Sequence, residues 1–278
     1  MISDHFYTTE QISAHIDGIR SKTGEIMYLV KGTEQAFLID TCLGVGNVRK
    51  VAESLTDLPI SVILTHGHVD HALGAPLFDK VYFNHLDDDL YKAHSPFEER
   101  QGYMEANLGA APGSLKDEEF VPVKDPKSYF SLEDGAAFDL GGIHLEVYAL
   151  CGHTQGCMTV LIPEERVLIT GDGANNATFV FDQYASTIEE YRNHLQALSD
   201  RLKGRYDRCF MMHHDMEASG NLLENVMQVC DDIMSGNTDD LPFDFMGGHY
   251  FIAKAVGPGF RRLDGGEGNI VYNKEKVR

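Results

Sequence analysis

Long apolar runs and basic residues are both scarce in this sequence. No apolar stretch approaches the roughly 20 residues that a bilayer-spanning helix needs, and residues 1–6 show neither the basic start nor the apolar run of a signal peptide. We therefore expect a cytoplasmic protein that does not associate with a membrane. Lys and Arg number 23 against 43 Asp and Glu, so the formal net charge is −20. A chain this acidic repels phosphate backbones, which argues against nucleic acid as a partner.

Paired cysteines are missing as well. The cysteines number five, without a CxxC pair, at positions 42, 151, 157, 209 and 230. Their number and spacing suit a reducing compartment, and we expect them to be small buried apolar residues. Cys151 and Cys157 flank His153, but no partner pair exists for them. A zinc finger is therefore excluded.

One short stretch concentrates the chemistry that the sequence does contain. Residues 66–71 read His-Gly-His-Val-Asp-His and follow an apolar, β-branched run that predicts a buried strand. Open α/β sheets place their chemistry at the carboxyl ends of such strands. On extended backbone His66 and His68 project to one side, while Asp70 and His71 fall on the other. Without a metal these groups would repel one another's protons, so the stretch predicts a metal site.

Residues 65–71 resemble the HxHxDH signature of the metallo-β-lactamase fold hydrolases. The resemblance implies an α/β fold of the four-layer αββα type, with two mixed β-sheets flanked by helices and a metal site at the sheet edge. Later segments follow in the order that this superfamily would show. Residues 152–156 are similar to its Gly-His-Thr-x-Gly segment and carry His153. Gly171-Asp172, after the next predicted hairpin, is similar to its bridging carboxylate.

The resemblance implies a ligand set for two divalent metal ions. One ion would be bound by His66, His68 and His153, the other by Asp70, His71 and His214, and both by the bridging Asp172. The last histidine has an alternative, because His213 precedes His214 at the end of an apolar strand and neighbouring residues face opposite ways. The superfamily's usual Gly-His-Gly ending places His214 in the ligand position.

The strand that ends at Asp40 carries a further resemblance. Asp40-Thr41-Cys42 is similar to the Asp-Thr-Gly ending of an early strand in the superfamily, although Cys42 replaces the glycine. The resemblance implies that Asp40 braces the metal loops through hydrogen bonds without binding the ion. A carboxylate that only closes a turn is the alternative interpretation.

We expect one domain over residues 1–278, because the signature elements are spread from Asp40 to His214. Residues 86–131 interrupt the strand and helix pattern with many Asp, Glu, Pro and Gly residues. We expect this stretch to be a partly helical cover over the metal cleft and a source of substrate selectivity. A solvated insertion or an oligomer contact is the alternative, which leaves a homodimer open.

Residues 243–278 are expected to form a glycine-rich C-terminal hairpin. Within it, His249 and Tyr250 are candidate contacts to the substrate. A structural role for both residues is the favoured interpretation.

The function implied is that of a metal-dependent hydrolase acting on a small molecule. Two dications would supply a metal-bridging hydroxide that attacks an ester-type bond, which could be a thioester, a lactone or a phosphodiester. Asp70 would also act as a catalytic group that passes a proton to the leaving group. Nitrogen and oxygen ligands without a thiolate suit Zn²⁺ by default, and Mn, Fe or Ni would also fit. The alternatives are a mononuclear iron persulfide dioxygenase of the same superfamily and a non-catalytic metal-binding protein.

Overall fold

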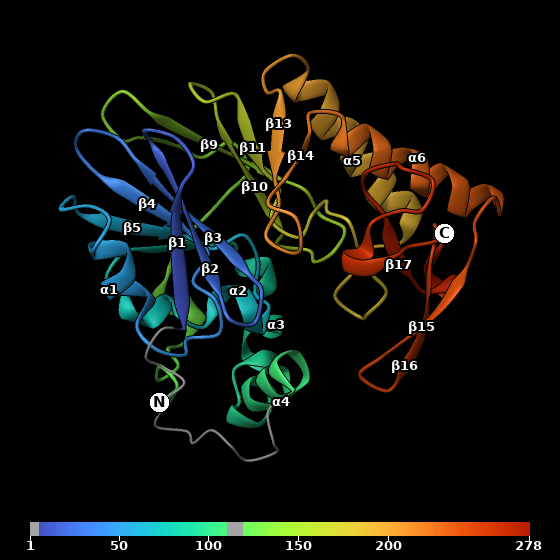
Figure 1. Cartoon of the computed structure of the whole chain (residues 1–278), viewed down its shortest axis with the longest axis horizontal. Helices are drawn as coiled ribbons and strands as arrows, with labels where there is room; N and C mark the ends of the chain where they lie inside the picture. The colour runs from blue at the N-terminus through green and yellow to red at the C-terminus, as the bar shows by residue number, and fades with distance from the viewer. Residues whose placement is uncertain (1–5, 110–118) are drawn as a thin grey trace. The chain divides into compact units, whose positions relative to one another are not determined.

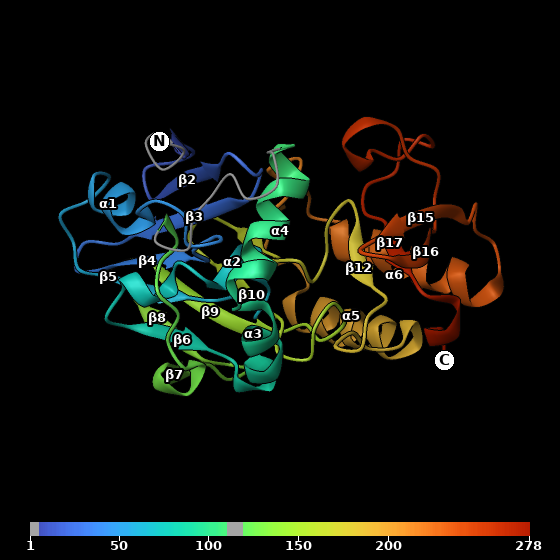
Figure 2. The same ribbon diagram turned by 90° about the horizontal axis from the view of Figure 1, so that it is seen from below.

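The computed structural model describes residues 6–109 and 119–278. The chain divides into two compact units, unit 1 over Met1–Leu145 and unit 2 over Glu146–Arg278 (Figures 1 and 2). Both units combine mixed β-sheets with helices, so the predicted α/β class is confirmed. The expectation of a single domain over residues 1–278 stays a prediction. Among the described residues, no helix has the length and apolar character that a membrane span requires.

Unit 1 is built on a seven-stranded mixed sheet whose strands follow one another in chain order. The strands are β1 (Tyr7–Gln11), β2 (Ile16–Ser21), β3 (Ile26–Lys31), β4 (Ala36–Ile39), β5 (Ile60–Ile63), β6 (Val81–Phe83) and β7 (Phe130–Ser131). Short turns join β1 to β4, and these four strands pair antiparallel in chain order. Longer crossovers with helices join β4 to β7, which pair parallel because such connections return the chain in the same direction.

The helices of unit 1 lie in the crossovers between the parallel strands. They are α1 (Val48–Glu53), α2 (Val69–Ala72), α3 (Asp88–His94) and α4 (Phe97–Leu108), with the 3-10 turns η1 (Ala75–Leu77), η2 (His85–Asp87) and η4 (Pro126–Ser128). Asn47 caps α1 by accepting a hydrogen bond of 3.0 Å from the backbone N–H of Lys50. A short strand, β8 (Ala137–Asp139), follows β7.

The apolar core of unit 1 ties these helices to the sheet. Leu38 and Val62 on the central strands belong to the same buried cluster as Ala52 of α1 and Met104 of α4. The predicted helical content of residues 86–131 is confirmed where the stretch is described, by α3 and α4. Part of that stretch, residues 110–118, lies outside the described residues.

Unit 2 contains a mixed sheet whose strands run in the order β14-β13-β11-β10-β9. The strands are β9 (His144–Ala149), β10 (Met158–Ile162), β11 (Val167–Ile169), β13 (Arg208–Phe210) and β14 (Glu217–Ser219). β11 and β13 are parallel because the long helix α5 (Ile188–Leu202) crosses between them. The side chains of Thr187 and Glu190 form a capping box that starts α5. The apolar stripe of α5 is buried in the core of unit 2.

A second, four-stranded sheet in unit 2 runs in the order β12-β17-β16-β15. Its strands are β12 (Thr178–Val180), β15 (Leu241–Phe245), β16 (Gly248–Ile252) and β17 (Ile270–Tyr272), and nearby lie α6 (Leu222–Ser235) and the 3-10 turns η5 (Pro258–Phe260) and η6 (Lys274–Lys276). The predicted C-terminal hairpin is present as the antiparallel pair β16 and β17. It is extended by β15, which the turn at Met246 and Gly247 joins to β16.

Candidate metal centre

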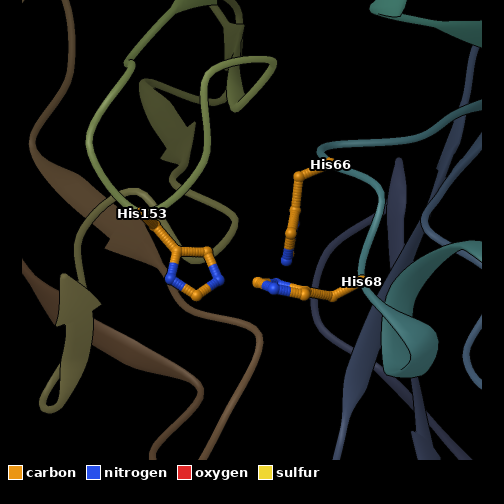
Figure 3. A group of neighbouring side chains, drawn as sticks. All are labelled: His66, His68 and His153. Carbon is orange, nitrogen blue, oxygen red and sulfur yellow. The ribbon is translucent and has the colours of Figure 1, made fainter. Parts of the chain in front are cut away.

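The loop between β5 and α2, together with α2 itself, carries the four predicted ligands of unit 1. β5 ends at Ile63, and α2 begins at Val69, directly after His68. The rings of His66 and His68 lie nearly perpendicular, with centroids 4.8 Å apart (Figure 3). Asp70 and His71 follow on the first turn of α2, and Asp70 Oδ2 lies 3.5 Å from His71 Nε2. Unit 1 therefore brings its four predicted ligands into one loop and one helical turn.

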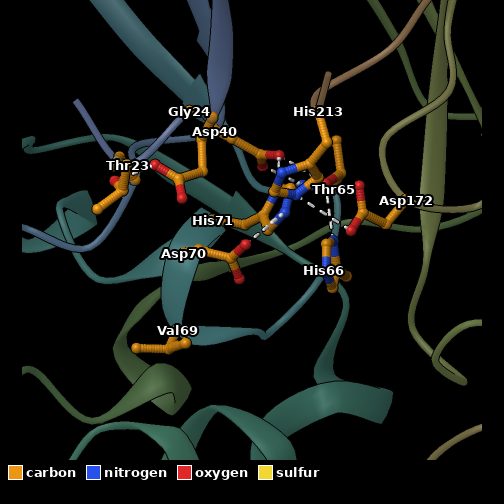
Figure 4. Close-up of polar contacts among 12 residues, drawn as sticks. Thr23, Gly24, Asp40, Thr65, His66, Val69, Asp70, His71, Asp172 and His213 are labelled. Carbon is orange, nitrogen blue, oxygen red and sulfur yellow. Dashed lines mark hydrogen bonds and ion pairs between the residues drawn. The ribbon is translucent and has the colours of Figure 1, made fainter. Parts of the chain in front are cut away.

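Asp40, at the end of β4, holds this loop by three hydrogen bonds (Figure 4). Its Oδ1 accepts from the backbone N–H of Thr65, and its Oδ2 accepts from the Thr65 hydroxyl and from His71 Nδ1, each over 2.7 Å. Asp40 is almost fully buried, so these three donors replace the water that would otherwise solvate its carboxylate. Asp40, His66 and His71 have potential ligand atoms within 4.8 Å of one another. Because both oxygens of Asp40 already accept hydrogen bonds, the geometry favours an orienting role for Asp40 over metal binding.

The hydrogen bonds also select the nitrogen that each histidine can offer to a cation. A carboxylate only accepts, so His71 carries its proton on Nδ1, and the lone pair lies on Nε2. The Thr65 hydroxyl donates to Asp40, so it accepts from Nδ1 of His66 over 3.0 Å. In unit 2, Nδ1 of His153 donates to the carbonyl of Phe179 over 2.6 Å. All three imidazoles are therefore arranged as metal-binding histidines commonly are, with Nδ1 hydrogen-bonded and Nε2 as the ligand atom.

Residues of the 86–131 stretch contact the ligand loop directly. Asp87 Oδ2 accepts from the backbone N–H of Gly67 over 3.0 Å, and His94 Nδ1 accepts from the N–H of Val69 over 3.3 Å. A Cβ atom on Gly67 would lie 3.0–3.2 Å from Asp87 and Tyr91, so the approach is close. The described part of the stretch thus packs on the loop, as a cover would. Its role in substrate selectivity stays a prediction.

Tyr103 on α4 links the ligand loop to a buried carboxylate that the sequence did not reveal. Its hydroxyl lies 2.8 Å from Asp70 Oδ2 and 2.8 Å from Oε1 of Glu25. A phenol has one proton, so it donates to one of these carboxylates at a time. Burial, and then the charges of Asp70 and Glu25, raise the pKa of Tyr103 well above its usual value. Tyr103 therefore stays protonated and can donate its one proton either to Asp70 or to Glu25.

Cys42 explains how the strand ending tolerates the loss of the expected glycine. Its φ of 59° lies in the left-handed region, which glycine adopts at little cost and other residues do not. The thiol is buried and donates to Oε2 of Glu25 over 3.3 Å, so the side chain is held by the same carboxylate as Tyr103. Burial raises the pKa of the Cys42 thiol well above its usual value. All five cysteines are free thiols.

In unit 2, Asp172 follows β11 and lies beside His153 and His213; Figure 4 shows it with His213. Its Oδ2 is 3.8 Å from Nε2 of His153 and 3.3 Å from Nε2 of His213. A carboxylate between two imidazole nitrogens is the arrangement that a bridging ligand needs. Gly152 does not have a positive φ, so backbone conformation is not what requires glycine there. A Cβ atom at that position would lie 2.0 Å from the Tyr191 ring, so close packing against α5 is the reason.

After β13, His213 lies beside Asp172, and the ring of His214 lies beside Phe260. His214 has a φ of 60°, and its ring faces Phe260 with centroids 5.0 Å apart. Burial, and then the neighbouring His213, lower the pKa of His214. β13 ends at Phe210, and the N–H of Met211 bonds to the carbonyl of Met216, so residues 211–216 form a turn. The alternation of an extended strand, from which only one of the two histidines was expected to face the metal, does not apply in this turn. The choice of His214, which depended on the resemblance to Gly-His-Gly, stays a prediction.

The two predicted substrate contacts lie on opposite faces of β16. His249 is 85% exposed and pairs with Asp244 across the hairpin. Tyr250 stacks on Phe181, with ring centroids 3.9 Å apart and an angle of 16° between the planes. Tyr250 therefore belongs to an apolar cluster, and His249 does not. A substrate contact by either residue stays a prediction.

Sequence comparison identifies proteins that are similar to this chain. The human acyl-coenzyme A thioesterase MBLAC2 is 24% identical over 177 residues, which cover 59% of this chain and 63% of that protein. Thus the chain spans a little under two thirds of the human relative. The hydroxyacylglutathione hydrolase GloC of Haemophilus influenzae is 26% identical over 168 residues, which cover 56% of this chain and 72% of that protein.

Solved structures give the same fold. A metallo-beta-lactamase from Pontibacter korlensis matches with a TM-score of 0.57 and 18% identity, over 80% of this chain and 97% of that chain. The sec-alkylsulfatase Pisa1 from Pseudomonas sp. matches with a TM-score of 0.62 and 15% identity, over 83% of this chain and 42% of that chain. These likenesses confirm the fold predicted from the sequence. The profile of the metallo-beta-lactamase superfamily matches residues 26–213. With more than half of its length matched, the chain belongs to the metallo-β-lactamase superfamily.

Proposed function

We propose that this protein is a metal-dependent hydrolase that cleaves a thioester in a small molecule. The observation that carries the proposal is the common arrangement of His66, His71 and His153. Each has Nδ1 held by a hydrogen bond, so each can offer Nε2 to a cation. Imidazole and carboxylate donors without a thiolate fit zinc, and they also fit manganese, iron or nickel.

The proposed ligand set holds two divalent ions. His66, His68 and His153 would bind one, Asp70, His71 and His213 the other, and Asp172 both. This is the set implied by the superfamily resemblance, with His213 in place of His214 because of its distance to Asp172. When bound, a pair of divalent ions lowers the pKa of a coordinated water and polarises the carbonyl under attack.

The residues of the chain would orient the ligands, transfer a proton and exclude water. Asp40 and Thr65 keep the loop and its imidazoles in one orientation. The hydroxyl of Tyr103 lies within hydrogen-bonding distance of Oδ2 of Asp70, and when it donates there it fixes this oxygen. The Asp70 carboxylate would take up a proton during attack and deliver it to the leaving thiolate. Burial of these groups excludes water and strengthens their electrostatic interactions.

The relatives support a thioester over a lactone or a phosphodiester. One is an acyl-coenzyme A thioesterase and another is a hydroxyacylglutathione hydrolase. Both names place an acyl group on a thiol-bearing carrier. The acidic net charge of −20 does not oppose an anionic carrier, because bound dications reverse the local field.

The test combines metal analysis with a substrate panel. We expect purified protein to contain about two divalent ions per chain, to lose activity after chelation, and to hydrolyse thioesters faster than lactones or phosphodiesters once the metal is restored. His68→Ala and His153→Ala should each lower the metal content and abolish hydrolysis. His144→Ala, a half-exposed histidine in β9, is the matched control and should change neither. One iron per chain, with oxygen consumed in the presence of a persulfide, would replace the proposal with the dioxygenase alternative.

A further inference from the structure

The four-stranded sheet of unit 2 has two very different faces. On one face, Val180, Ile270 and Tyr272 belong to the large core that includes the stripes of α5 and α6. On the opposite face, aromatic rings gather around a smaller apolar cluster. We call this surface the aromatic face, and it comprises Phe179, Phe181, Phe243, Phe245, Tyr250 and Phe260.

The sequence of the hairpin places these rings on one side. Leu241, Phe243 and Phe245 of β15 are half-buried, while Pro242 and Asp244 between them are exposed. Alternation of this kind marks a strand with one apolar face. Phe243 pairs directly with Tyr250 across the hairpin, so the two rings lie on the same side.

Ring contacts connect the hairpin to β12. Phe179 lies with its ring centroid 5.3 Å from that of Phe245 and 5.7 Å from that of Phe243. Phe181 stacks on Tyr250. The aromatic face is therefore one continuous set of rings, and none of its residues is charged.

The rings stay partly exposed although they are packed together. Phe181 is 9% exposed and the other five are classed between buried and exposed. Within the described part of unit 2, the other side chains of this cluster come from the sheet itself and from loops, and none comes from α5 or α6. A contiguous, partly exposed apolar surface is expected at a binding site, because leaving it in water is unfavourable.

The aromatic face begins beside two residues of the candidate centre. The carbonyl of Phe179 accepts the 2.6 Å hydrogen bond from His153, a proposed ligand. The ring of His214, next to the proposed ligand His213, faces Phe260. A carbonyl carbon under attack must lie within a few ångströms of the metal ligands. The part of the substrate attached to that carbon could then extend along the aromatic face.

We propose that the aromatic face binds the apolar acyl chain of the thioester substrate. This inference rests on the proposed function and specifies the substrate: an acyl group of several carbons or an aryl-acyl group, not a short polar one. The reason is chemical, because the face offers aromatic surface and no charge to pair with an ionic group. Each methylene buried there should raise kcat/KM about fourfold.

The test compares acyl chains on one carrier. Acetyl and octanoyl thioesters of the same thiol would be assayed with the unmodified protein, with Phe245→Ala and with Phe243→Leu. We expect the unmodified protein to prefer the octanoyl substrate by a large factor. Phe245→Ala should lower kcat/KM for octanoyl by about tenfold and for acetyl by less than twofold. Phe243→Leu, which keeps a large apolar side chain in the strand, should have the same pattern with a smaller loss.

Asp244→Ala is the matched control. Asp244 lies in the same strand, but it is 77% exposed and on the other face. The control should leave the octanoyl to acetyl ratio unchanged, and thermal unfolding of each variant should show that it folds. Equal losses on both substrates, or no loss on the octanoyl one, would overturn the inference.

A binding experiment separates this inference from the proposed function. Octyl and ethyl thioethers of the same thiol cannot be hydrolysed, so their affinities for the metal-loaded protein can be measured by calorimetry. Tighter octyl binding that weakens in Phe245→Ala supports the aromatic face even if no thioester is cleaved. Thioester hydrolysis without chain-length preference supports the function and rejects the face. A change from dimer to monomer in Phe245→Ala, with the preference unchanged, would instead identify the face as an interface between copies.

Discussion

The candidate ligands of unit 1 and unit 2 are held in different ways. In unit 1 one buried carboxylate, Asp40, accepts three hydrogen bonds and so fixes His71 and, through Thr65, His66. In unit 2 His153 is held by a backbone carbonyl, and His213 stands in a turn with 18% of its side chain exposed. A single side chain thus holds two histidines of the first set, whereas a backbone carbonyl holds His153 of the second. Unit 1 should therefore be the more sensitive to substitution of residues that do not bind metal.

The largest expected effect concerns the turn of unit 2. His213→Ala should remove a ligand and lower kcat/KM by more than about a hundredfold, because even losing a residue that only orients a ligand costs about 10–100-fold. His214→Ala should cost less than tenfold, since that ring faces Phe260. Hydrolysis rates and metal content of the two variants decide the matter. If His214→Ala were the one to lose the ion, the turn would present its histidines the other way round.

Substitution of Asp40 tests whether its three hydrogen bonds hold the ligand loop of unit 1. Asp40→Ala leaves the Thr65 N–H and the His71 ring without their buried acceptor, which should cost about 3 kcal/mol of unfolding free energy. The affinity for metal should fall about 10–100-fold, because His71 loses its fixed orientation.

Urea unfolding and competition with a metal chelator measure these two quantities. Asp139→Ala removes a carboxylate that is 67% exposed in the same unit and should change both by little. Similar losses in the two variants would mean that Asp40 only closes a turn, as the alternative interpretation of the sequence holds.

Substitution of Tyr103 should lower stability and activity less than substitution of Asp40. Asp40 accepts three hydrogen bonds, whereas the Tyr103 hydroxyl donates only one. Tyr103→Phe keeps the ring in place and removes the hydroxyl that lies between Glu25 and Asp70. We expect a loss of about 1 kcal/mol in unfolding free energy and a several-fold drop in kcat/KM. Tyr82→Phe, in β6 of the same unit, is the control. A variant with unchanged rate and metal affinity would show that Asp70 does not depend on α4.

Features that depend on a local motif or on apolar periodicity could be predicted from the sequence. The motif at residues 66–71 and the loops of His153 and Asp172 were found because each comes directly after a strand with a clear apolar pattern. Asp40 was assigned from its strand ending, and the structure shows the hydrogen bonds that such a role requires.

Features that depend on contacts between distant residues could not be predicted. Tyr103 and Glu25 are 78 positions apart, and neither lies in a motif, so nothing in the local pattern pointed to their hydrogen bond. The choice between His213 and His214 needed the left-handed backbone at His214, which is unusual for any residue with a side chain. The aromatic face needed the strand order, because β12 and β15 come together only through β16 and β17.

The smallest effect is expected at an exposed ion pair of unit 2, which provides the contrast to Asp40. Arg262 donates to both oxygens of Asp264, and these hydrogen bonds lower the pKa of Asp264 from its usual 3.8 to about 2. Because the folded pKa is the lower one, the stabilisation is present above pH 4 and is lost as the pH falls towards 2. The Asp264 side chain is 52% exposed, so solvent screens the pair and Asp264→Asn should cost less than about 1 kcal/mol at pH 7. Urea unfolding of the unmodified protein and of Asp264→Asn should show that the difference in their unfolding free energies is smaller at pH 3 than at pH 7. If Asp264→Asn lowered the unfolding free energy at pH 7 as much as Asp40→Ala does, the contrast between buried and exposed carboxylates would be contradicted.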